Sequence, residues 1–248
     1  MMILSKENKY NDIMFEELEK KINIFFENKK LLAEALTHRS YLNEYPKWKY
    51  NHNERLEYLG DAVLELAVTE YLFKKYPKSD EGNLTMIRAA LVNYQNLAKI
   101  AKNIDLDKFI LLSRGEKKDN SKAREVILAN AFEALVGAIY LDKGLEESKK
   151  FIEKFVLVKL DEILKTKSYK DAKSKLQEII QEKLKLTPNY EVLEESGPAH
   201  KRIFKVGVFF GDKLINEGIG PSKQEAEMEA ARKALENLDN SSNKNKNG

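Results

Sequence analysis

The sequence predicts a mainly α-helical protein with two domains, an all-helical domain at residues 1–166 and a smaller αβββα domain at residues 167–239. Three observations support this prediction. Apolar residues recur with a helical period almost without interruption to about residue 165. A short polar bridge at residues 165–170 then ends that pattern. Beyond it, runs rich in β-branched and aromatic residues lie between two further helical stretches.

The first domain is predicted to be a series of amphipathic helices separated by turn residues or charge. The predicted helices are Ile13–Phe26, Leu31–Leu36, Leu56–Phe73, Leu84–Ile100, Val126–Leu141 and Leu145–Leu164. The predicted breaks are Asn28–Lys30, Tyr45–Asn51, Pro77–Gly82, Arg114–Ser121 and Lys143–Gly144. The segment Arg114–Arg124 is polar and mostly basic, so it is either a solvated connector or a contact for a polyanion.

The second domain is predicted to run helix, three strands, helix. The helices are Ala172–Leu184 and Lys223–Leu238, and Pro221 precedes the second, where proline suits a helix start. The strands are Tyr190–Glu195, Ile203–Phe210 and Lys213–Ile219, with a Gly-Asp turn between the last two. The polar, low-complexity tail at 240–248 is expected to be disordered.

The composition limits the chemistry that the chain can support. Its 248 residues include 43 Lys and Arg against 40 Asp and Glu, and a net charge of +3 is too small to indicate a partner. Cysteine is absent, which excludes disulfides and thiolate chemistry and disfavours zinc. The histidines, His38, His52 and His200, do not have the spacing of helical metal ligands. A bound metal is therefore expected to be Mg²⁺ or Mn²⁺, held by oxygen atoms.

The sequence carries no signal for a membrane. No apolar run reaches the roughly 18 residues that a spanning helix needs, and the N-terminus lacks a signal-peptide pattern. We therefore expect a cytoplasmic protein with no membrane partner.

Acidic residues gather on one side of the helix predicted within NERLEYLGDAVLEL, residues 53–66. At 100° per residue, an arc of about 80° holds four carboxylates: Glu54, Glu57, Asp61 and Glu65. The opposite arc, expected to be buried, holds Leu56, Leu59, Val63 and Leu66. Like charges at this spacing weaken a helix, so the stripe indicates a neutralising cation. A solvated acidic face is the simpler alternative. Gly60 would permit another helix to approach closely.

The predicted helix Val126–Leu141 has an apolar middle interrupted by Asn130 and Glu133, which share one face that Gly137 keeps shallow. A helix that is apolar all round is expected to be central and buried. A lone glutamate there is costly unless it is paired or bound to a metal. The candidate partners for an ion pair are Arg55 and Arg88. Together with the acidic stripe, this helix favours instead a carboxylate Mg²⁺ site that activates water and holds phosphate oxygens.

Several stretches of the chain resemble the bacterial ribonuclease III family, in the family's order and spacing. NERLEYLGDAVLEL resembles the family's signature stretch. Further blocks of the first domain are ALTHRSYLNE (35–44), DEGNLTMIRAALV (80–92) and ILANAFEALVGAIYLDKG (127–144). In the second domain, LQE (176–178), GPAH (197–200) and SKQEAE (222–227) resemble a double-stranded-RNA-binding domain.

The resemblance implies a homodimeric endonuclease that cleaves double-stranded RNA with Mg²⁺, for which Mn²⁺ can substitute. It implies products with 5′-phosphates and short 3′ overhangs, and a role in processing rRNA precursors and other structured transcripts. By position, Glu57 and Glu133 are metal ligands, and Asp61 belongs to the catalytic cluster. Glu54 and Glu81 are outer acidic positions of the active-site valley.

Three positions depart from the family's pattern. Tyr58 stands where the family usually has a phenylalanine that inserts into a socket of the partner subunit, and its hydroxyl needs a polar partner. Asn130 stands where the family has an aspartate that ligates metal, although an amide oxygen can still bind Mg²⁺. Lys223 is followed by Gln224 instead of a second lysine. The main alternative is therefore a catalytically weakened dimeric duplex-RNA-binding protein, and a weaker one is an interaction scaffold.

Candidate RNA-binding residues lie at three places in the second domain. Gln177 and Glu178 on its first helix, the His200 loop, and Lys223 at the start of its last helix could contact the grooves and phosphates of duplex RNA. Taken alone, Lys223 is a solvated surface lysine. Residues 169–238 carry 12 Lys and Arg against 12 Asp and Glu, so binding must come from local clustering. We expect modest affinity with a shallow salt dependence.

Overall fold

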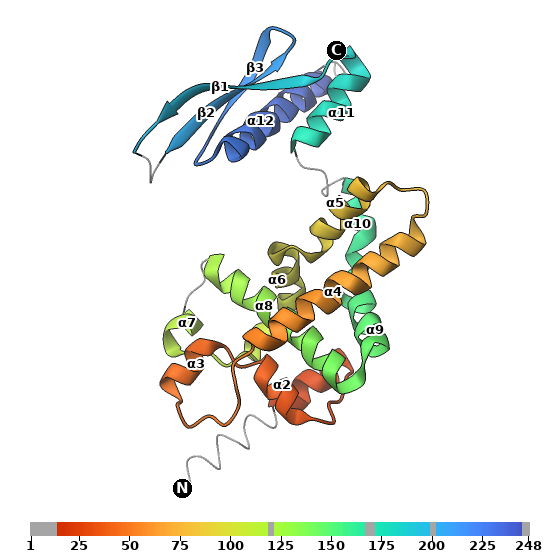
Figure 1. Cartoon of the computed structure of the whole chain (residues 1–248), viewed down its shortest axis with the longest axis vertical. Helices are drawn as coiled ribbons and strands as arrows, with labels where there is room; N and C mark the ends of the chain where they lie inside the picture. Colours follow the sequence, from red (N-terminus) through yellow and green to blue (C-terminus); the bar gives the residue numbers. More distant parts are fainter. Residues whose placement is uncertain (1–13, 119–121, 167–171, 199–201, 245–248) are drawn as a thin grey trace. The chain divides into compact units, whose positions relative to one another are not determined.

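The computed structural model describes residues 14–118, 122–166, 172–198 and 202–244 (Figure 1). The chain divides into two compact units between residues 169 and 170. The first unit is all-helical and the second is a three-stranded sheet with helices, which confirms the predicted fold class. None of the helices in the described ranges combines the length and the apolar character that crossing a membrane requires.

The first unit begins with a helical segment at residues 14–22. Its further α-helices are α2 (Lys29–Ala35), α3 (Arg39–Glu44), α4 (Glu54–Lys75), α5 (Glu81–Val92), α6 (Tyr94–Asn103), α7 (Arg114–Lys118), α8 (Lys122–Lys143), α9 (Leu145–Phe155) and α10 (Leu160–Thr166). Two short 3₁₀ turns are η1 (Leu106–Lys108) and η2 (Leu157–Lys159).

Helix α8 lies at the centre of the first unit, as its apolar sequence predicted. Its side chains are buried on nearly all sides, and Phe132 and Leu135 are fully enclosed. Helices α2, α4, α6 and α9 pack around it (Figure 1). This arrangement surrounds the polar pair Asn130 and Glu133 with elements that can bring other side chains to it.

Several predicted boundaries in the first unit were wrong, each for a local reason. The helix predicted at Leu84–Ile100 is two helices, because Asn93 is extended and its side chain caps α6 by accepting from the Asn96 N–H. The first helix ends before Phe26, because Asn23 adopts a left-handed conformation with φ of 60°. The last predicted helix is broken at Val156 into α9, η2 and α10. The start of the predicted loop at Arg114 is the short helix α7.

The buried face of α4 is also rotated from the predicted one. Leu56 and Val63 are buried as expected, but Leu59 is half-buried and Leu66 is 54% exposed. The buried stripe is centred instead on Gly60, Leu64 and Ala67, which face α8. Leu66 therefore belongs to an exposed side of the helix.

The second unit contains α11 (Ala172–Leu184), the strands β1 (Pro188–Ser196), β2 (Ile203–Phe210) and β3 (Lys213–Gly220), and α12 (Lys223–Lys244). The strands form an antiparallel sheet in the order β1-β2-β3. Helix α12 continues past Leu238 into the segment for which we expected disorder, and residues 245–248 lie outside the described ranges.

Both helices of the second unit pack against the sheet through small or apolar side chains. The core joins Leu176 and Ile180 of α11 to Val208 of β2 and the alanines of α12. A Cβ at Gly218 of β3 would lie only 2.1 Å from the carbonyl oxygen of Ala226. The alanine-rich face of α12 is therefore what allows the helix to lie directly on the sheet.

Candidate active site

Helices α4 and α8 cross with their backbones in contact. A Cβ at Gly60 would lie 1.8 Å from the carbonyl oxygen of Glu133, and a Cβ at Gly137 would lie 2.3 Å from that of Leu56. The crossing therefore requires glycine on both helices, as the shallow faces in the sequence suggested. It brings the acidic stripe of α4 against the polar pair of α8.

Four side chains converge at this crossing: Glu57, Asp61, Asn130 and Glu133. The amide of Asn130 donates a hydrogen bond to the carboxylate of Glu57, and this bond lowers the pKa of Glu57. The other influences act in the opposite direction. Burial and the neighbouring charge of Glu54 raise the pKa of Glu57. Burial, followed by the charges of Asp61 and Glu57, raises the pKa of Glu133 to about 8.

The ion pair considered for Glu133 does not form. Arg88 donates instead to the hydroxyl of Thr69, and no Lys or Arg pairs with Asp61 or Glu133 among the described residues. Three carboxylates thus face one another, and no cation from the described part of the chain pairs with Asp61 or Glu133. That arrangement costs free energy that a bound cation would recover.

The donor set of the crossing fits a hard divalent cation in its chemistry. Carboxylate and amide oxygens are the ligands that Mg²⁺ and Mn²⁺ prefer. Within the described ranges, no group of three or more His, Asp or Glu side chains lies in an arrangement that could by itself hold a metal ion.

The two outer acidic positions differ in their surroundings. Glu54 lies beside Glu57, and its carboxylate is 3.6 Å from Arg39 and 3.8 Å from His52. Glu81 is exposed in the first turn of α5 and accepts from the hydroxyl of Thr85. It does not affect the pKa of Glu57 or Glu133. The structure therefore joins Glu54 to the cluster and leaves Glu81 at a separate position.

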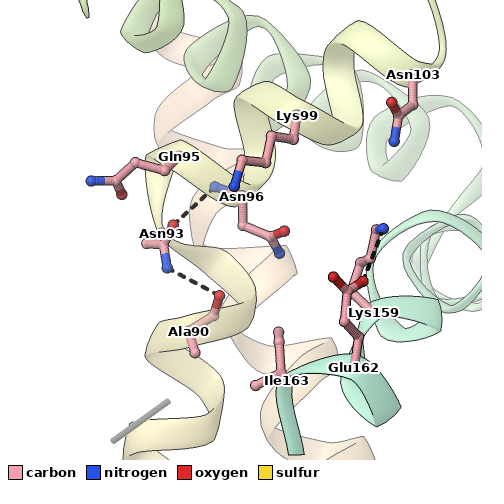
Figure 2. A pocket seen from close by; sticks show the side chains of 9 residues that line it. All are labelled: Ala90, Asn93, Gln95, Asn96, Lys99, Asn103, Lys159, Glu162 and Ile163. Carbon is pink, nitrogen blue, oxygen red and sulfur yellow. Dashed lines mark hydrogen bonds and ion pairs between the residues drawn. The ribbon is translucent and has the colours of Figure 1, made fainter. Parts of the chain in front are cut away.

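Away from the helix crossing, a recess of about 780 Å³ lies in the first unit between α6 and the η2–α10 segment (Figure 2). Its polar side chains are mostly amides and lysines. Asn93 caps α6, Asn96 donates to the carbonyl of Leu91, and Lys159 pairs with Glu162 at 3.3 Å. Its lining holds one carboxylate, Glu162, which is paired with Lys159, and no histidine.

Both units of the chain resemble known protein families. Residues 28–160 match the family described as Ribonuclease-III-like, and residues 172–238 match the Double-stranded RNA binding motif. "Ribonuclease 3" of a Nitratiruptor species is 46% identical over 90% of this chain and 96% of that protein. "Ribonuclease 3" of Carboxydothermus hydrogenoformans is 47% identical over 90% of this chain and 95% of that protein.

This chain belongs to the ribonuclease III family. It is an endoribonuclease with a double-stranded-RNA-binding domain. Among solved structures, the nuclease domain of ribonuclease III from Campylobacter jejuni is 46% identical, with a TM-score of 0.51, over 56% of this chain and 96% of that one. That structure is described as showing flexibility in a region involved in dimer formation of the domain. Membership of the ribonuclease III family implies a divalent metal requirement.

Three of the four predicted RNA-binding residues lie within the described part of the second unit. Gln177 and Glu178 are exposed on α11, and Lys223 is exposed in the first turn of α12, which packs against α11. The ammonium of Lys223 lies 5.7 Å from the centre of the Phe204 ring. His200 falls outside the described residues.

Tyr58, the predicted dimer contact, is 83% exposed. It borders a recess of about 640 Å³, which we call the α4 recess. The apolar lining of this recess is Leu31, Leu56, Leu59 and Leu141, and its polar lining includes Glu34, Asn51 and His52. Sequence reasoning assigned no role to Glu34, because nothing in the pattern of α2 distinguishes it from a solvated glutamate.

Proposed function

We propose that this ribonuclease III cleaves double-stranded RNA with Mg²⁺, with Mn²⁺ as a substitute, to 5′-phosphate products with short 3′ overhangs. Its proposed role is the processing of rRNA precursors and other structured transcripts in the cytoplasm. The observation that carries the proposal is the convergence of Glu57, Asp61, Asn130 and Glu133 at one helix crossing, where none of the described Lys or Arg residues pairs with Asp61 or Glu133.

In this proposal, Glu57 and Glu133 hold the metal through carboxylate oxygens and Asn130 through its amide oxygen. A bound divalent cation supplies an activated water and stabilises the departing 3′-oxygen of the phosphodiester. Asp61, which is more exposed, keeps the charge of the cluster high beside the position of the phosphate. Glu54 orients Arg39 at the rim of the cluster, and Glu81 is an outer acidic residue.

The second unit is proposed to deliver the substrate. Duplex RNA exposes its 2′-hydroxyls and phosphates, and a domain of this kind recognises the shape of the A-form groove. Gln177 and Glu178 are proposed to contact one minor groove, His200 the next, and Lys223 the phosphates between them. This division of roles rests on the exposure of the described residues and on the family match.

The nuclease unit is proposed to act as a homodimer. One side of α4 exposes Tyr58, Leu66 and Phe73, which fall within an arc of about 80° at 100° per residue. Exposed apolar side chains gathered on one side of a helix are typical of a protein interface. A two-fold dimer would also supply two acidic clusters, one for each strand of the duplex.

A gel assay with a long RNA duplex tests the proposal. Cleavage is expected with Mg²⁺ and Mn²⁺, and EDTA should abolish it. A single-stranded RNA and a DNA duplex of the same sequence serve as controls and should remain intact. Duplex-RNA binding without cleavage at any metal concentration would support a weakened binding protein instead. The intact set Glu57, Asp61 and Glu133 argues against that alternative.

A further inference from the structure

The α4 recess contains a buried carboxylate, Glu34, that receives hydrogen bonds on only one of its two oxygens among the described residues. Glu34 is 9% exposed, although it lines an open recess with four leucines. Its Oε1 accepts hydrogen bonds from the backbone N–H of Asn51, at 3.3 Å, and from the Asn51 side chain, at 3.0 Å. Lys30 lies 3.7 Å from the same oxygen. Among the described residues, Oε2 receives no hydrogen bond.

The other polar groups of the recess are less suited to accept a hydrogen bond. The amide of Asn51 is engaged with Glu34. The Nδ1 atom of His52 is closed off from solvent, and the nearest carboxylate oxygen, on Glu54, is 3.8 Å away. Arginine has only donors. Glu54 is the other carboxylate of the lining, but its two oxygens face Arg39 at 3.6 Å and His52 at 3.8 Å. Glu34 Oε2 is therefore the carboxylate oxygen of the recess that no cation or donor contacts among the described residues.

The occupant that fits is a large ring with a hydroxyl donor at its far end. The leucines would bury the ring, and a charged carboxylate is a strong acceptor for a phenol. Tyr58 presents such a ring at the edge of the recess, on helix α4, which also supplies Leu56 and Leu59 to the lining. A surface that carries both a projecting group and its complementary recess is self-complementary, and a two-fold axis can pair each with the other.

We infer that the hydroxyl of Tyr58 from a second copy of the chain donates a hydrogen bond to Glu34 in the α4 recess. The inference rests on the dimer proposed above and adds a polar contact to it. The two-fold axis produces two such contacts in each dimer. A phenylalanine in place of Tyr58 would bury the same ring and leave the carboxylate without its donor.

The test measures the dimer dissociation constant of the full-length protein by sedimentation. The variants are Tyr58→Ala, Tyr58→Phe, Glu34→Gln, and Tyr58→Phe combined with Glu34→Gln. Glu34→Gln keeps an oxygen for the Asn51 contacts, so the fold is retained. Tyr71→Phe is the matched control, because Tyr71 lies on the same helix and its hydroxyl contacts Lys75.

Tyr58→Phe should weaken the dimer roughly tenfold or more, as expected for loss of a hydrogen bond to a charged group. In the Glu34→Gln background the same substitution should have a much smaller effect, and Tyr71→Phe should have none. A dimer that Tyr58→Ala weakens and Tyr58→Phe leaves unchanged would overturn the inference, as would equal effects of Tyr58→Phe in both backgrounds. A wild-type protein that is monomeric at micromolar concentration would overturn the proposed dimer itself.

Discussion

Glu133 on α8 faces Asp61 on α4, and after burial the charge of Asp61 is the strongest influence that raises the pKa of Glu133 to about 8. A carboxyl group with this pKa is mostly protonated at neutral pH when no cation is present. A bound divalent cation would favour the ionised form. The stability of the helix crossing should therefore depend on pH and on bound metal, because both change the protonation of Glu133.

The stability of the metal-free protein should fall as the pH rises from about 5 to 8. The folded chain holds a proton on Glu133 that the unfolded chain, with an ordinary pKa of 4.5, has already released, so rising pH favours unfolding. Glu133→Gln should reduce this decline by about 1–3 kcal/mol. Thermal melts in EDTA at about pH 5 and pH 8 measure this decline in stability. An equal decline in the wild type and in Glu133→Gln would contradict the raised pKa of Glu133.

Glu133→Gln should also abolish cleavage while leaving duplex-RNA binding largely unchanged. The substitution removes a charged oxygen from the cluster and preserves the shape of the side chain. Single-turnover cleavage and filter binding measure the two properties separately. Glu125→Gln is the matched control, because Glu125 lies on the same helix in a surface contact with Lys102. Normal turnover in Glu133→Gln would eliminate the two-helix metal site.

Gly60→Ala should destabilise the nuclease unit by about 3 kcal/mol or more. The new Cβ would lie 1.8 Å from a backbone oxygen of α8, and backbone cannot move aside as a flexible side chain can. Gly82→Ala is the control, because its nearest neighbour is a side-chain oxygen at 3.4 Å. Urea denaturation compares the two. Equal stability of both variants would show that α4 and α8 are not in backbone contact.

The sequence predicted the helix crossing because the relevant signals are local. Helical spacing placed Glu57 and Asp61 on one face, and it placed Asn130 and Glu133 on one face of a helix too apolar to be exposed. Gly60 and Gly137 then indicated where the two helices could touch. Periodicity alone also placed Glu54 and Glu65 on the acidic face, and it was the resemblance to the ribonuclease III family that singled out Glu57, Asp61 and Glu133.

Other features depend on contacts that periodicity does not reveal. Glu34 lies in the α4 recess because residues of α4, α8 and the loop before α4 meet there, and α2 alone gives no sign of it. The exposure of Leu66 follows from the rotation of α4 toward α8. The break at Asn93 had a readable signal, because asparagine is a strong helix N-cap, but the apolar spacing continued through it.

The two units should separate functionally. A protein that ends near Lys165 should fold, dimerise and cut at low salt, with weaker RNA binding. The isolated fragment 169–248 should bind an RNA duplex in preference to a DNA duplex, because its contacts suit the A-form groove and 2′-hydroxyls. Titrations with both duplexes measure the preference, and equal affinities would indicate a general polyanion binder or a protein-docking module.

Asn130→Asp should lower the metal concentration that the enzyme needs and raise its activity. The substitution adds a negative charge to the cluster, which in a partly buried site changes metal affinity roughly tenfold to a few hundredfold. It also removes the amide donor that holds Glu57, so the metal-free protein should become less stable. Cleavage rates across a series of Mg²⁺ and Mn²⁺ concentrations, with melts in EDTA, measure both effects. If Asn130→Asp neither lowers the metal requirement nor raises the activity, Asn130 does not contact the metal. If the wild type fails to cut even at high Mn²⁺ while the aspartate variant is active, the chain is a duplex-RNA-binding protein with a weakened site.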